Sequence, residues 1–389
     1  MVTQRTGIAT FGLDYGRCPP WLFNKMKRLA RLLTEAIVYE YSPAEFIRRM
    51  SDPFFFQSFG TLLAFDWNAS GLTTTTTAAI KEALRGTEHS LGLFVAGGKG
   101  KTSRKTPSDI ENFSQRFSFN PQPLIYSSKM SAKVDNTAIQ DGFQLYHHAF
   151  FFTVEKTGLP RYSASGEHPE NSGANPEKNF TWAVVQQGMA PSTIRRAHGG
   201  EQGRTTISGQ GLARRYHWFS DNVSDFVEEP HTGITQPQKR KVLNLTAKES
   251  HNTKTTSVGL INDPQTLMKD LKVLDYVGVP FSHRRLEKTL HLAAEKEPKN
   301  FENLLATKGV GPKTIRALSL ISEVIYGAKP SYKDPAKYSY AHGGKDGIPY
   351  FVDRKTYDQS IKVLERAVRK AKMGVPERQE AFKKLEKYL

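Results

Sequence analysis

The stretch Phe143–Glu155, FQLYHHAFFFTVE, decides the fold class of this chain. Aromatic and β-branched residues dominate it, and similar compositions recur in Leu91–Ala96 (LGLFVA), Pro123–Ser128 (PLIYSS) and Phe180–Gly188 (FTWAVVQQG). Runs of this kind, bounded by Gly, Pro and Asn, are typical of β-strands. They predict a mostly antiparallel sheet in the middle third of the chain.

Helices are predicted before this sheet. Apolar residues recur at helical spacing over residues 22–37, with Lys and Arg at many of the remaining positions. The stretch Ser42–Glu45 (SPAE) is a capping-box pattern that starts a second helix, and the apolar run Phe54–Phe65 is interpreted as a helix buried under the sheet. The threonine run Thr73–Thr77 leads into a further short helix.

The chain is predicted to turn helical again from about residue 236. The helical stretches after that point are Lys241–Ser250, Pro264–Tyr276, Asp358–Met373 and Glu377–Leu389. We therefore expect an α+β protein, with a mixed domain of antiparallel sheet and helices at 1–235 and a helical domain at 236–389. Polar stretches at about 157–178 and 195–211, rich in Gly and Ser, are interpreted as loops inserted into this scaffold.

The chain carries a large positive charge. Its 389 residues include 55 Lys and Arg against 38 Asp and Glu, a formal net charge of +17, which favours an anionic polymer or surface as partner. The single cysteine, Cys18, excludes an intrachain disulfide and a thiolate metal cluster. No segment has the roughly 20 apolar residues of a membrane span, so we expect a cytoplasmic, nucleoid-associated protein without a membrane partner.

A tight glycine turn lies in the stretch Thr307–Leu318, TKGVGPKTIRAL. Apolar residues before and after it predict a short helix, a turn and a second helix over about 301–327. Gly309 and Gly311 let the backbone turn sharply, while the second helix offers unpaired N–H groups to an anion. Lys313 and Arg316 lie three residues apart, so both cations can flank one phosphate.

This stretch resembles the helix-hairpin-helix motif of DNA repair and recombination proteins. Gly309, Val310, Gly311 and Lys313 match the motif, and Lys308 stands where many members have proline. The resemblance implies backbone binding without base reading by the residues Gly309, Val310, Gly311, Lys313, Thr314 and Arg316. In the glycosylase branch a lysine matching Lys313 attacks the sugar, and an aspartate about 18 residues later assists. Here position 331 is serine and the nearest aspartate is Asp334.

The chain as a whole looks like a member of an uncharacterised, mainly archaeal domain-of-unknown-function family with a C-terminal helix-hairpin-helix. The stretches that carry this resemblance are TGIA, DPFFFQSFG, FDWNASGLTTT, VAGGKGK, VDNTAIQDGFQLYHHAFFF, WAVVQQGM, ARRYHW, GVGPKTIRAL and AHGGKDGIPYFVDR. It implies a shared fold and a role related to DNA.

Three further stretches combine cations with glycine or aromatic residues. VAGGKGKT resembles a phosphate-binding P-loop, but Val95 stands where that pattern needs glycine, so no nucleotide cofactor is expected. Lys99 and Lys101 in this stretch, Arg214 and Arg215 in ARRYHW, and Lys345 in AHGGKDG are predicted to contact nucleic acid. A solvated loop, a packed strand and a structural turn are the respective alternatives.

Carboxylates and histidines form a candidate catalytic set. Its members are Asp135, Asp141, His147, Glu228, His231 and Asp346. Of these, Asp135, Asp141, Glu228 and His231 are predicted to hold Mg²⁺ or Mn²⁺ for phosphodiester hydrolysis. His147 and His148 are adjacent in a strand and therefore point to opposite faces. The alternative is that these groups are surface carboxylates and hydrogen-bonded strand histidines.

These observations favour a DNA-binding protein of repair or processing, and among such proteins a metal-dependent, structure-selective nuclease. A glycosylase or lyase that uses Lys313 is the first alternative. A non-catalytic factor that binds structured DNA or RNA is the second.

Overall fold

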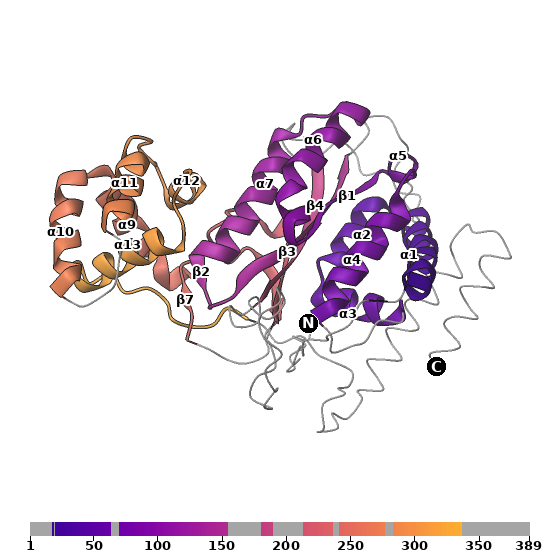
Figure 1. Cartoon of the computed structure of the whole chain (residues 1–389), viewed down its shortest axis with the longest axis horizontal. Helices are drawn as coiled ribbons and strands as arrows, with labels where there is room; N and C mark the ends of the chain where they lie inside the picture. The colour runs from indigo at the N-terminus through magenta and orange to yellow at the C-terminus, as the bar shows by residue number, and fades with distance from the viewer. Residues whose placement is uncertain are drawn as a thin grey trace, which may run out of the picture.

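The computed structural model describes residues 18, 20–63, 70–154, 180–189, 213–235, 241–276 and 283–336. Within them the chain forms a mixed α+β structure around an antiparallel sheet, with a helical region towards the C-terminus. The predicted fold class is therefore confirmed. Figure 1 shows two lobes: a sheet lobe, from α1 to β6, and a helical lobe, from α9 to α13. In the described residues no helix is both long and apolar enough to cross a membrane.

The central sheet contains five antiparallel strands in the order β1-β3-β4-β5-β6. Their bounds are β1 Leu93–Lys99, β3 Gln144–Val154, β4 Phe180–Met189, β5 Ala213–Phe219 and β6 His231–Thr235. Because side chains alternate between the two faces of a strand, each strand contributes to two cores. Phe150 and Phe152 face one core and Phe151 faces the other. Both faces of the sheet are covered.

Helices from the N-terminal part of the chain cover one face of the sheet (Figure 1). They are α1 Pro20–Glu40, α2 Pro43–Met50, α3 Pro53–Leu62, α4 Ser70–Leu84 and the short α5 Glu88–Leu91. Ser42 caps α2 as predicted, since its hydroxyl oxygen accepts from the Glu45 amide at 3.0 Å. The apolar stretch 54–65 forms most of α3, whose Phe56 and Phe59 are buried beneath the sheet. The threonine run is part of α4 itself.

The opposite face carries the remaining helices of the sheet lobe and adjoins the helical lobe. These elements are the 3₁₀ helix η1 Gly100–Lys105, α6 Thr106–Phe117, α7 Gln122–Lys133 and the π-helix η2 Val134–Ala138. A further 3₁₀ turn, η4 Ser220–Asn222, follows β5. The strands β2 Ile139–Gln140 and β7 Leu243–Asn244 form a separate antiparallel pair that joins the lobes. The helical lobe contains η5 Lys248–Ser250, α9 His251–Asn262, α10 Pro264–Tyr276, α11 His283–Ala294, α12 Phe301–Ala306 and α13 Pro312–Val324.

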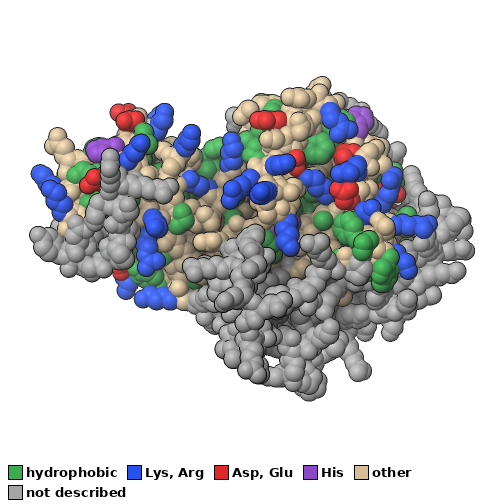
Figure 2. All heavy atoms as spheres, in the orientation of Figure 1, with side chains coloured by type: hydrophobic (Ala, Val, Ile, Leu, Met, Phe, Trp, Pro, Cys, Tyr) green, Lys and Arg blue, Asp and Glu red, His purple; other side chains and the backbone are tan. Residues whose placement is uncertain are grey.

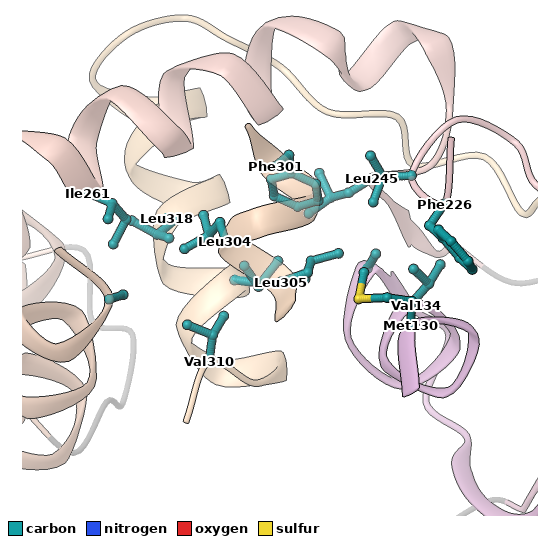
Figure 3. Packing of buried hydrophobic residues seen from close by; sticks show 14 of the residues in the cluster. Met130, Val134, Phe226, Leu245, Ile261, Phe301, Leu304, Leu305, Val310 and Leu318 are labelled. Carbon is teal, nitrogen blue, oxygen red and sulfur yellow. The ribbon is translucent and has the colours of Figure 1, made fainter. Parts of the chain in front are cut away.

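One hydrophobic cluster runs from the sheet into the helical lobe without interruption. It contains Met130 of α7, Val134 of η2, Phe226 after β5, and Phe301 and Leu305 of α12 (Figure 3). Burial of apolar surface is the main force that holds such elements together. The two lobes are therefore packed as one body through this cluster.

Two predictions of secondary structure are wrong, one of a strand and one of a helix. Pro123–Ser128 was expected to be a strand and lies in α7, where Leu124, Ile125 and Ser128 face the interior at helical spacing. Lys241–Ser250 was expected to be a helix and instead contains β7 and η5. In both cases the apolar run was too short to distinguish the helical period from the strand period. Packing against the rest of the chain therefore determined the secondary structure.

Several predicted features lie outside the described residues. These are the inserted loops at about 157–178 and 195–211, the two C-terminal helices, and the AHGGKDG stretch with Lys345 and Asp346.

Candidate functional site

The glycine turn between α12 and α13, called the hairpin turn (residues 307–311), has the geometry that its sequence predicts. Asn300 caps α12 by accepting from the Asn303 amide at 2.8 Å. Gly309 has a φ of +94°, in the region that favours glycine. Val310 is only 1% exposed and packs in the cluster beside Leu305 (Figure 3). The turn is therefore pinned by one apolar side chain while its glycines stay at the surface.

Cationic and backbone groups surround this pinned turn on its outer side. The side chains of Lys308, Lys313 and Arg316 are exposed, as is Gly309. Gly311 is the N-cap of α13 and supplies no capping side chain, so the first N–H groups of the helix have no intrahelical partner. The residues predicted to bind the backbone are thus brought together around the turn, but two of them have buried side chains: Val310, which anchors the turn, and Thr314. The side chain of Thr314 faces the interior, so it is not a surface contact.

The hairpin turn is docked against the sheet lobe by polar contacts. The Gln140 side-chain amide in β2 donates to the Pro312 carbonyl at 2.8 Å. The Tyr126 hydroxyl in α7 donates to the Glu302 carboxylate in α12. Together with the shared hydrophobic cluster, these contacts fix the orientation of α13 relative to the sheet.

A second cationic surface, the glycine loop (residues 97–105), follows β1. Lys99, Lys101, Arg104 and Lys105 are exposed there, and none of them forms an ion pair with another residue in the described part of the chain. The next helix, α6, starts at Thr106. Lys99 and Lys101 are therefore placed at the surface, in keeping with their predicted role.

Asp135 is the centre of a buried hydrogen-bond network. It lies in η2 and is 1% exposed. Its carboxylate accepts from the Gln186 amide at 2.7 Å and from the Trp218 indole at 2.9 Å, and it contacts His231 Nε2 at 2.5 Å. Asp135 and His231, both predicted metal ligands, are therefore in contact, and donors from the strands β4, β5 and β6 surround the carboxylate.

Gln186 extends this network to a second histidine. Its side-chain oxygen contacts His148 Nδ1 at 2.9 Å, and His148 Nε2 contacts the Ser128 hydroxyl at 2.9 Å. Burial lowers the pKa of His148, although its contact with Gln186 acts in the opposite direction. The imidazole is therefore neutral at physiological pH. The network links α7, η2, β3, β4, β5 and β6 inside the molecule.

Asp141 belongs to a separate ionic cluster around Arg214. The Arg214 guanidinium lies 3.2 Å from the Asp141 carboxylate and also pairs with Asp334. Tyr216 donates to Asp141 at 2.6 Å. Burial raises the pKa of Asp141 to about 6, although Arg214 and Tyr216 act in the opposite direction. Asp334, the aspartate nearest in sequence to Lys313, is thus engaged by an interior arginine.

The predicted ligand Glu228 and the predicted catalytic residue His147 each have a partner of their own. The Glu228 carboxylate pairs with Lys254 of α9. His147 points to the other face of the sheet, as predicted for adjacent strand histidines, and its Nε2 lies 3.0 Å from the Thr77 hydroxyl. Burial, with nearby positive charge, lowers the pKa of His147 to about 3. Among the described residues, no group of three or more metal-ligand side chains comes together.

The prediction that Arg214 and Arg215 contact nucleic acid needs correction. Every residue of β5 is buried, including both arginines, so ARRYHW is an interior strand. Arg215 faces α3 and α4, where its guanidinium contacts the Gln57 side chain at 3.0 Å and Thr73 at 3.4 Å. Strand periodicity explains the error, because alternate cations in a central strand enter the two covered faces and do not form a patch.

Several partners in the interior clusters and in the contacts between the lobes were not predicted from the sequence. They are Gln57, Thr73, Thr77, Tyr126, Ser128, Gln140, Tyr216 and Lys254. For the interior members, the one available signal was a polar residue at a position that helix or strand periodicity assigns to the interior. Such groups are normally hydrogen-bonded, but the sequence does not say to what.

The chain belongs to the DUF763 family of proteins of unknown function, whose model matches residues 7–158 and 176–352. This match covers most of the chain and both lobes. No curated protein and no solved structure matches the chain.

Proposed function

We propose that this protein binds DNA by gripping the sugar-phosphate backbone with the hairpin turn and the first turn of α13. The main observation behind the proposal is that one residue of the hairpin turn is buried in the core while the residues around it are exposed. Val310 anchors the turn in the core, while Gly309, Lys308 and Lys313 remain exposed around it. An anchored turn of this kind presents backbone N–H groups and cations at fixed positions, which suits phosphate oxygens.

The sequence of the turn supports the same proposal. Its glycine, valine, glycine and lysine match the helix-hairpin-helix pattern, and the structure has a short helix, a tight turn and a longer helix at those residues. Contacts of this type hold phosphates and sugars and carry no direct sequence information. We therefore expect DNA binding without sequence preference, in keeping with a nucleoid-associated protein.

Binding is better supported than hydrolysis. The carboxylates proposed to hold Mg²⁺ or Mn²⁺ are engaged by other side chains: Asp135 by His231 and its other donors, Asp141 by Arg214, and Glu228 by Lys254. A lyase reaction at Lys313 would need an assisting aspartate, and Asp334 is paired with Arg214. The non-catalytic DNA-binding factor is therefore the function that the described residues support best.

Charge reversal at the start of α13, next to the hairpin turn, tests the proposal. The double variant Lys313→Glu/Arg316→Glu should lose DNA affinity, and its plot of log K against log salt should flatten by about 2 because two phosphate contacts disappear. The measurement is fluorescence anisotropy with a labelled duplex of about 25 base pairs at several salt concentrations. Lys269→Glu/Lys272→Glu on α10 is the matched control, because both lysines are exposed and the charge change is the same.

The proposal is wrong if the hairpin variant keeps the wild-type slope, or if the control loses as much affinity. The same labelled duplex, together with forked and abasic DNA, is incubated with Mg²⁺ or Mn²⁺ and with EDTA. Binding without strand scission is the expected result. Cleavage that requires the metal would replace the binding factor with a nuclease.

A further inference from the structure

The glycine loop is a group of exposed cations that the hairpin turn does not include. Lys99, Lys101, Arg104 and Lys105 lie close together in sequence at the end of β1 and in η1. Their side chains are exposed and form no ion pair within the described part of the chain. Unneutralised cations at this density attract a polyanion.

This loop stands on a rigid base. The Asp109 carboxylate of α6 accepts from the Gly97 amide at 2.9 Å and from Lys81 Nζ at 2.7 Å. Lys81 also donates to the Gly97 carbonyl at 2.8 Å. Asp109 is thereby occupied on the inner side of the loop, and it does not neutralise the exposed cations. The base holds the start of the loop while the lysine and arginine side chains project from it.

The glycine loop and the hairpin turn belong to one body. Lys99 pairs in register with His147 in the sheet, and Gln140, a short distance earlier in the chain, donates to Pro312 at the hairpin turn. The chain from Gln140 to His147 spans at most about 25 Å when fully extended. With the reach of the side chains added, the two surfaces lie within about 40 Å, which is about 12 base pairs of duplex DNA.

We infer that the glycine loop is a second backbone-binding surface, and that one DNA duplex is held at both the hairpin turn and the glycine loop. This inference rests on the proposed function of the hairpin turn. Figure 2 shows Lys and Arg side chains on both lobes of this face, with Asp and Glu side chains interspersed among them on each lobe. A duplex held at two points of a rigid body gains affinity from the second contact only when it is long enough to reach it.

The test uses Lys101→Glu/Arg104→Glu in the full chain and stem-loop DNA duplexes from about 5 to about 25 base pairs. On long duplexes the variant should bind roughly tenfold or more weakly, with the salt slope reduced by about 2. Below a threshold length, no greater than about 12 base pairs, it should bind like the wild type. Lys25→Glu/Arg28→Glu on the exposed side of α1 is the control for net charge.

The outcomes distinguish the inference about the glycine loop from the proposed function of the hairpin turn. Equal weakening on short and long duplexes would mean two independent sites and would overturn the inference, as would unchanged binding on long duplexes. Equal weakening in the α1 control would overturn it too, because net charge would then explain the effect. The hairpin variant is measured on the same series: if it alone loses affinity, the proposed function stands and only the second surface is wrong.

Discussion

Two pairs of basic residues occupy opposite environments in this protein, one exposed and one buried. Each pair has glycine or aromatic neighbours in the sequence. Lys313 and Arg316 at the start of α13 are exposed, whereas Arg214 and Arg215 in β5 are buried. The first pair follows a glycine turn and lies on the outer side of a helix. The second pair lies in a strand between two covered faces. Basic residues in a sequence therefore indicate an anionic ligand only when the secondary and tertiary structure leaves their side chains exposed to solvent.

The difference also separates two kinds of electrostatic behaviour. Exposed cations exchange counterions with solvent, so their contribution depends on salt. Buried ionisable groups have shifted pKa values, so their contribution depends on pH. Matched substitutions in the two regions should therefore have different effects on stability and on DNA binding.

The largest expected effect is the loss of Arg214. Arg214→Met leaves Asp141 and Asp334 without their cation in the interior, and breaking a buried pair in this way costs about 3–5 kcal/mol. Arg316→Met, the same change at the surface, should alter stability by less than about 0.5 kcal/mol and weaken DNA binding instead. Urea unfolding and anisotropy measure the two effects. Similar stability for both variants would remove the distinction between the two regions.

The next effect is the pH dependence that comes from His147. Its pKa is about 3 in the folded state, because of burial first, and ordinarily near 6.5. The unfolded state therefore binds more protons between these values, and stability falls as the pH falls below about 6.5. At pH 5 this one group should cost about 2 kcal/mol relative to pH 7. Asp141, whose pKa is raised to about 6, acts in the opposite direction over the range from about 4 to 6.

The measurement is urea unfolding of the wild type and His147→Gln at several pH values. The stability difference between them should shrink by about 2 kcal/mol from pH 7 to pH 5, because glutamine does not titrate. The exposed His251 offers a control, His251→Gln, which should follow the wild type. A constant difference across the range would show that His147 does not stay neutral in the folded protein.

A smaller effect is expected from the backbone of the hairpin turn. Gly309→Ala forces a side chain into a positive-φ conformation, at a cost of about 1–2 kcal/mol. An added Cβ would meet Thr289 only at an ordinary 3.7 Å, so the cost is conformational. Gly327 has a φ of +67° and lies away from the turn. Gly327→Ala should lose similar stability and keep DNA affinity, whereas Gly309→Ala should lose both; equal affinities would contradict a role for the turn.

The smallest effect concerns the contact between the lobes. Gln140→Ala removes the hydrogen bond to the Pro312 carbonyl and should cost about 0.5–1.5 kcal/mol. Gln144→Ala, at an exposed position, is the control. If the docking of α13 matters for a duplex held at two points, Gln140→Ala should also weaken binding to long duplexes more than to short ones. Equal stability of the two variants would show that the contact is not formed in solution.

Much of the fold was predictable because its signals are local. The runs of aromatic and β-branched residues in β3 and β4, the cap at Ser42 and the glycines of the hairpin turn each determine a conformation over a few residues. The predictions failed where the pattern was short, as in α7 and at β7. There, neighbours distant in sequence chose the conformation.

The candidate site was predictable only at the surface. Lys313, Arg316 and the glycine loop were placed correctly at exposed positions from their local sequence. The carboxylates were not, because the partner of a buried charge is set by which strands and helices meet. Asp135 meets His231 across 96 positions of sequence, and Arg214 meets Asp334 across 120.

The sequence by itself determined the antiparallel sheet, the amphipathic helices and the tight turn that presents Lys313 to solvent, because these depend on backbone preferences and on the period of apolar residues. Only the tertiary structure decided which charges are interior. A charge leaves water only when desolvation is offset by partners, and those partners come from distant parts of the chain. Arg214 and Arg215 were therefore assigned to the interior by the packing of β5 between two layers of helices, while Lys313 and Arg316 remained at the surface.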